Sequence, residues 1–223
     1  MRPLFFLVFC LPFMAQAQVN QDSVAIKKMA DEIMTNGTAY DLLRELTKKI
    51  GGRLAGSPQQ QNAAIWGKRN LEAMKPDKVY MQPCKTPNWQ RGGKDFAAIV
   101  GINGKPTNQK LEALALGNSL SSNGLVEADV LAVANFDELE KRKDEVKGKI
   151  VYYHSEFDPT FIQTFKAYSA AGTYRGTGAS RAAKYGAGGV MIHSLSTAPD
   201  NAPHTGGMKY DSAYPKIPAV ALG

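Results

Sequence analysis

The sequence is poor in cysteine. Its 223 residues include only Cys10 and Cys84, and Cys10 lies in a segment that we expect to be removed. Cys84 then has no partner for a disulfide bond within the chain. A zinc site built from several cysteines is excluded as well, because structural zinc sites take four Cys or His ligands. Nothing near Cys84 in the sequence supplies the base that a catalytic thiol needs, so we expect a half-buried cysteine in a strand.

Histidine is also scarce, and the three in the chain are His154, His193 and His204. None of them begins a His-x-Asp pair, and the sequence has no H-E-x-x-H motif. Because three scattered histidines make no metal-binding spacing, we predict no metal ligand and no bound zinc in this chain. His154 and His193 each stand at the end of an apolar strand and are interpreted as hydrogen-bonded structural residues. His204 lies in a loop bounded by proline and glycine, where functional residues concentrate.

Other catalytic and binding patterns are missing too. Residues 178–182, GASRA, lack the last glycine of the G-x-S-x-G nucleophile elbow. The acidic residues between 137 and 145 alternate with basic ones at helical spacing, which is typical of a solvated helix face. The formal net charge is +7, but the basic residues are scattered and form no continuous stripe interleaved with aromatic residues. No nucleic-acid partner is therefore expected.

The N-terminus has the three parts of a secretory signal peptide. Met1–Arg2 supplies a basic residue, Pro3–Met14 is an apolar run of 12 residues, and Ala15 and Ala17 are small. A bilayer span needs about 20 apolar residues, and no second long apolar segment follows. We therefore predict a signal peptide over residues 1–17 with cleavage after Ala17. The product is expected to be exported, periplasmic or extracellular, with no membrane association once the signal is removed.

Residues 18–115 are expected to contain helices followed by strands. Apolar residues at helical spacing predict three helices between residues 24 and 74, the third with Pro58 at its first position. Short apolar or β-branched runs at residues 79–81 and 96–101 predict strands.

Residues 116–223 are expected to form a small sheet with flanking helices. Apolar and β-branched runs predict strands at 128–134, 149–153 and 190–193, and helical patterns cover 136–143 and 178–185. Gly186 stands where the end of a helix needs a positive φ. The succession of strand, helix and strand from residue 149 to residue 193 has the character of a parallel sheet.

Several motifs resemble those of a known peptidase family. KGKIVYY (Lys147–Tyr153) and AAKYGAGGVMIH (Ala182–His193) together resemble the protease-associated (PA) domain, a module found inside several peptidases and receptors. Further segments resemble, in the same order, the N-terminal portion of the carboxypeptidase Q-like zinc metallopeptidases. These segments are Ile50–Met74, Val79–Gly92, Ala115–Leu120, Phe136–Val151, Pro203–Gly206 and Pro215–Leu222.

The resemblance implies an exported zinc-dependent exopeptidase or dipeptidase, of carboxypeptidase or aminopeptidase type, that acts on small peptides. It implies an α/β fold with some α+β character. Residues 18–115 would belong to an incomplete peptidase domain, and residues 116–223 to an inserted PA domain that borders the active site. It also implies two zinc ions, whose ligands would lie C-terminal to the PA module and outside this chain. His204, in the matching PHTG segment, becomes a candidate contact to substrate or to the neighbouring domain. A hydrogen bond that orders the loop is the alternative role.

Residues 215–222 have the pattern of an incoming strand, and the sequence stops at Gly223. We therefore expect the N-terminal part of a longer enzyme, inactive by itself, whose partner is the missing C-terminal catalytic part of the same polypeptide. The alternative is a non-catalytic PA-type module that binds peptides or proteins. No oligomeric state is predicted.

Overall fold

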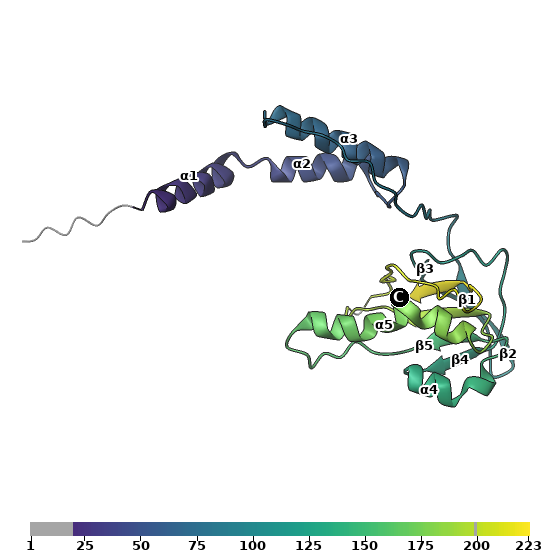
Figure 1. Cartoon of the computed structure of the whole chain (residues 1–223). Helices are drawn as coiled ribbons and strands as arrows, with labels where there is room; N and C mark the ends of the chain where they lie inside the picture. The colour runs from purple at the N-terminus through teal and green to yellow at the C-terminus, as the bar shows by residue number, and fades with distance from the viewer. Residues whose placement is uncertain (1–19, 199) are drawn as a thin grey trace, which may run out of the picture. The chain divides into compact units, whose positions relative to one another are not determined.

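The computed structural model describes residues 20–198 and 200–223 (Figure 1). The predicted signal peptide lies outside these residues. The chain divides into two compact units, described separately here. Unit 1 comprises the described residues up to Arg53 together with Pro58–Pro83, and unit 2 comprises Leu54–Ser57 and Cys84–Gly223. Over the described ranges, no helix combines the length and apolar character needed to cross a membrane.

Unit 1 contains the three helices that the sequence predicts. They are α1 (Gln21–Asn36), α2 (Ala39–Glu45), which continues as the π-helical turn η1 (Leu46–Ile50), and α3 (Pro58–Ala73). Pro58 is the first residue of α3, as expected of a residue that has no N–H to leave unpaired. None of these helices has a fully buried residue. Their apolar stripes, for example Ile26 and Ile33, face solvent in the described chain.

The strand predicted at residues 79–81 is absent, because this segment pairs with no other strand. Cys84 follows it and is exposed, so the expectation of a half-buried strand cysteine is wrong. The strand predicted at 96–101 is present as β1 (Ala97–Ile102), which pairs antiparallel with β2 (Lys105–Leu111). Asn103 and Gly104 connect them with φ of 51° and 74°, the backbone of a tight hairpin turn.

Unit 2 is built around a five-stranded, mostly parallel sheet, which confirms the mixed α/β class. The strand order is β3 (Ala113–Ala115), β7 (Ala219–Leu222), β6 (Gly189–His193), β5 (Ile150–Tyr153) and β4 (Val130–Val133). β4 to β7 are parallel, and β3 runs antiparallel to β7 at one edge. The sheet thus includes three residues ahead of residue 116, while the predicted domain boundaries themselves stay a prediction.

The helices of unit 2 are α4 (Phe136–Lys141), the 3-10 turn η2 (Lys143–Glu145) and α5 (Thr164–Ala183). α5 packs against β5 and β6, and α4 packs against β4 and α5 (Figure 1). The prediction that α5 begins at residue 178 is wrong, because the helix starts 14 residues earlier, at Thr164. Glycines at 172, 176 and 178 disfavour a helix locally. The buried small face of α5 compensates by allowing close contact with the sheet.

The core of unit 2 lies between the sheet and α5. Tyr153 is its largest fully buried side chain. Its ring meets Phe136 edge-on at 5.6 Å between centroids and stacks with Tyr174 at 5.5 Å. The Tyr153 hydroxyl donates to the carbonyl oxygen of Gly178 at 3.1 Å. Gly186 lies just after the C-terminal end of α5 and has a φ of 83°, the positive value that the sequence predicted.

Candidate functional site

The parallel strands of unit 2 end at one edge of the sheet, and in open parallel sheets ligands bind outside this carboxyl edge. His154 follows β5, and Ser194 follows β6. The side chain of His154 is exposed. His193, the last residue of β6, is half-buried, and its Nδ1 lies 2.8 Å from the carbonyl oxygen of Ser194.

A shallow, open depression of about 380 Å³ lies at this edge, beyond β4 and β5. Its lining residues are Ala134, Asn135, His154, Ser155, Glu156 and Tyr174. Two of its polar groups, the Asn135 side chain and the Ala134 N–H, are already hydrogen-bonded within the protein. The Asn135 side chain accepts from the N–H of Glu138 at 2.9 Å and caps α4, and the Glu138 carboxylate accepts from the N–H of Ala134 at 2.8 Å. The side chains of His154, Ser155, Glu156 and Tyr174 remain as the polar groups of the depression that a ligand could meet.

His204 lies in the loop that follows β6, and its side chain is exposed. Its backbone N–H donates to Oγ of Ser194 at 2.8 Å, so the loop is ordered through the main chain rather than through the imidazole. The imidazole instead meets the ring of Tyr168 edge-on, with 5.7 Å between centroids. His204 as a substrate or domain contact stays a prediction, and the structure leaves its ring at the surface for such a contact.

Tyr168 connects His204 to Arg175, a residue that sequence reasoning missed. Tyr168 and Arg175 are both on α5, and Nη1 of Arg175 donates to the Tyr168 hydroxyl at 2.8 Å. The two residues are seven positions apart, which places them on the same helix face. The signal was therefore present in the sequence, but it could be used only if α5 was known to begin before Tyr168.

Zinc does not fit the residues present. Within residues 20–198 and 200–223, no group of three or more His, Cys, Asp or Glu side chains could hold a metal ion. No chemical step is therefore derived through a metal in this chain.

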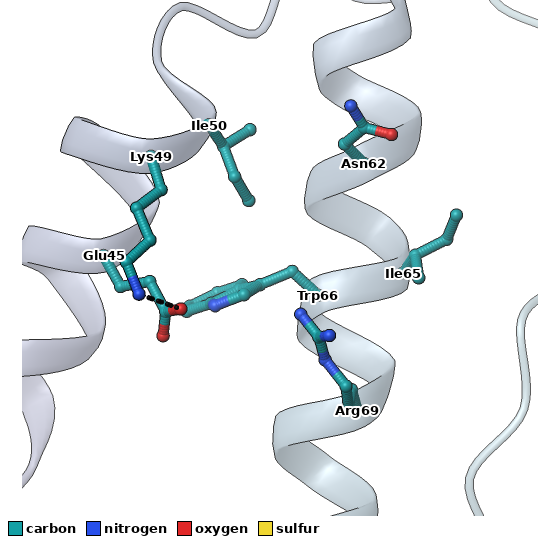
Figure 2. Close-up of a pocket in the computed structure, with 7 residues that line it drawn as sticks. All are labelled: Glu45, Lys49, Ile50, Asn62, Ile65, Trp66 and Arg69. Carbon is teal, nitrogen blue, oxygen red and sulfur yellow. Dashed lines mark hydrogen bonds and ion pairs between the residues drawn. The ribbon is translucent and has the colours of Figure 1, made fainter.

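Unit 1 has a second depression of about 270 Å³ (Figure 2). Its lining residues are Glu45, Lys49, Ile50, Asn62, Ile65, Trp66 and Arg69. Figure 2 shows the Trp66 ring extending from α3 towards Glu45, which is paired with Lys49 at 3.0 Å. The indole of Trp66, and then the Lys49 ammonium, lower the pKa of Glu45. The indole nitrogen is buried and has no partner at full hydrogen-bond geometry among the described residues.

Comparisons with known proteins agree with the motifs. No family model matches the chain. Carboxypeptidase Q of Xenopus laevis is 33% identical over 186 residues, which are 82% of this chain and 37% of that protein. The chain thus spans little more than a third of the length of the curated relatives that it matches.

Solved structures show the same relationship. The crystal structure of a peptidase M28 precursor from Shewanella amazonensis superposes with a TM-score of 0.80 at 30% identity, covering 91% of this chain and 45% of that one. A zinc aminopeptidase from Bacillus subtilis has a TM-score of 0.51 at 19% identity, over 82% of this chain and 37% of that one, and shows the fold alone. Sequence and structure together confirm the predicted relationship: the chain is a homologue of part of carboxypeptidase Q and of part of the Shewanella M28 peptidase.

Proposed function

We propose that the chain is the N-terminal part of an exported, zinc-dependent exopeptidase or dipeptidase that hydrolyses small peptides. The observation that carries the proposal is the 33% identity to carboxypeptidase Q over 82% of this chain. The superposition on the Shewanella peptidase over 91% of the chain supports it. Export is proposed from the signal-peptide pattern of residues 1–17.

The two zinc ions would be held by the part of the polypeptide that this chain lacks, since the described residues contain no ligand cluster. When bound, such ions supply a nucleophilic water and stabilise the developing oxyanion. In this proposal, residues 116–223 form the inserted PA domain. The contribution of unit 2 is to border the active site and to bind substrate at the carboxyl edge of its sheet.

The test compares two proteins in a dipeptide hydrolysis assay with and without a metal chelator. One is the 223-residue chain, and the other is the native secreted product. We expect an intact mass well above 24.2 kDa for the native product, together with turnover that the chelator abolishes, and no turnover by the 223-residue chain. Stoichiometric zinc and turnover in the 223-residue chain would overturn the assignment of the zinc site to the missing part. A native product at or just below 24.2 kDa without hydrolysis would favour the alternative, a non-catalytic peptide-binding module.

A further inference from the structure

An arginine with unused hydrogen-bonding capacity lies beside His204. Arg175 is half-buried, and its Nη1 donates to the hydroxyl of Tyr168 at 2.8 Å. Its Nε is fully buried without a partner, one of two such side-chain atoms in the part of the chain that the structure describes. Nη2 makes no hydrogen bond to the described residues and, unlike Nε, is not fully buried.

The charge of Arg175 is not neutralised within the described chain. The ion pairs found over residues 20–198 and 200–223 do not include Arg175, so no carboxylate of these ranges lies within 4.0 Å of its guanidinium. A guanidinium stays protonated in proteins, and burying part of it without an opposite charge is unfavourable. Such an arrangement is expected where the opposite charge arrives with a ligand.

The loop that carries His204 holds the guanidinium in place. A Cβ built on Gly206 would lie 2.7 Å from Cζ of Arg175, 2.9 Å from Nε and 2.9 Å from Nη1. Because these three atoms are almost equally distant, the flat face of the guanidinium lies against the Gly206 backbone. Arg175 also contacts the Tyr168 ring, with Cζ 5.1 Å from the ring centroid. Any side chain at residue 206 would occupy the space that the guanidinium fills.

Hydrogen bonds from the sheet and from α5 fix the loop itself. Oγ1 of Thr205 donates to the carbonyl oxygen of Ala115 at 2.9 Å, and the N–H of Gly117 donates to that of Gly206 at 2.8 Å. The N–H of Lys209 donates to the carbonyl oxygen of Gly176 at 3.0 Å, next to Arg175 on α5. The guanidinium is therefore held before any ligand binds, which lowers the entropic cost of binding.

Aromatic surface continues from this cation along α5. Phe165 is 79% exposed, and its ring lies 5.7 Å from that of Tyr168. The exposed ring of His204 meets Tyr168 at the same centroid distance, 5.7 Å. A ligand with one carboxylate and a neighbouring apolar side chain would match this combination of an arginine and aromatic rings.

We propose that Arg175, Tyr168 and His204 form a binding site for the free α-carboxylate of a peptide. The ligand carboxylate accepts charge-assisted hydrogen bonds from Nη2 of Arg175. The C-terminal side chain of the peptide lies against Phe165 and Tyr168. This inference rests on the proposed function for its ligand class. It makes Arg175 a specificity-determining residue that favours substrates with a free C-terminus.

The test measures binding to the 223-residue chain, so it needs no catalysis and can fail independently of the proposed peptidase function. The dipeptide Gly-Phe and its C-terminal amide are titrated by calorimetry and by NMR of the backbone amides. We expect the dipeptide to bind at least about tenfold more tightly than the amide, because the amide carries no negative charge. Shifts of resonances around residues 168, 175 and 204 should accompany binding of the dipeptide.

Variants locate the site. Arg175→Gln should lose at least about tenfold in dipeptide affinity and change amide binding little, because only the charged ligand uses the guanidinium. Gly206→Ala should also weaken the dipeptide, since the added methyl group displaces the guanidinium. Lys209→Gln removes an exposed positive charge from the same loop and should leave the affinity unchanged. Circular dichroism checks that each variant is folded.

Three results would overturn the proposal. The first is equal affinity of the acid and the amide, a comparison that stays informative even if a variant fails to fold. The second is acetate binding as tightly as Gly-Phe, which would mean a general anion site rather than a peptide site. The third is a folded Arg175→Gln variant with unchanged dipeptide affinity.

Discussion

The close contact between α5 and β5 leaves no room for a methyl group at Gly178. A Cβ at this position would lie 2.8 Å from Cε2 of Tyr153, closer than side-chain carbons approach one another. The Tyr153 ring cannot swing away easily, because Phe136 and Tyr174 pack on it and its hydroxyl is bonded to the Gly178 carbonyl. Gly178→Ala therefore forces the helix away from the sheet or the ring from its position.

Two opposing effects set the size of the change. Replacing glycine by alanine inside a helix stabilises it by about 1 kcal/mol through helix propensity. Overpacking a buried contact costs about 1–3 kcal/mol. Gly176 offers a matched control on the same helix, because a Cβ there meets no atom within 4 Å. We expect Gly176→Ala to raise the free energy of unfolding by up to about 1 kcal/mol, and Gly178→Ala to lie about 1–3 kcal/mol below that control.

The assay is urea denaturation followed by tryptophan fluorescence. The chain has two tryptophans, Trp66 in unit 1 and Trp89 in unit 2, and a Trp66→Phe background makes Trp89 the reporter of unit 2. Trp89 is suited to this because its indole N–H donates to the carbonyl oxygen of Ser119 at 2.9 Å, within the same unit. If Gly178→Ala stabilised unit 2 as much as Gly176→Ala, the inferred close packing of α5 on Tyr153 would be refuted.

Two further predictions concern polar contacts of unit 2. Ser119→Ala removes the buried acceptor that receives the N–H of Ala219 at 2.9 Å, and should destabilise by about 1–3 kcal/mol in the same urea assay. The exposed control Ser121→Ala should change stability by less than about 0.5 kcal/mol, and equal effects would contradict the buried role. The hydrogen bond from Arg142 lowers the pKa of Glu145 below its usual 4.5. The stability that this bond contributes is therefore present above pH 4.5 and lost as the pH falls through the lowered pKa. Arg142→Gln should reduce the loss of stability on acidification from about pH 7 to pH 3, and an unchanged pH profile would contradict the link.

Short sequence patterns predicted the strands, helix starts and turns, because these features depend on residues that are close together in the sequence. β-branched and aromatic residues predicted the strands β4, β5 and β6, and the helix between β5 and β6 predicted that these two run parallel. Pro58 marked the start of α3, and Gly186 marked a turn with positive φ, because each residue type has its own backbone restriction. The relationship to carboxypeptidase Q was indicated by short motifs in their order.

Contacts between distant residues decided what the sequence could not. The helical pattern predicted this helix only from residue 178, and α5 begins at Thr164 because its small face packs closely on the sheet. Local composition likewise indicated a strand at residues 79–81, but a strand exists only where a partner pairs with it.

The candidate carboxylate site also depends partly on local sequence and partly on contacts between distant residues. The sequence by itself determined that His204 stands in a loop after a parallel strand, where functional residues concentrate. Only the tertiary structure placed Tyr168 and Arg175 beside that loop, with Gly206 against the guanidinium. The physical reason is that this contact joins Arg175 on a helix face to Gly206 in a turn 31 positions further along the chain. Local propensities depend on neighbouring residues and cannot predict which distant residues meet.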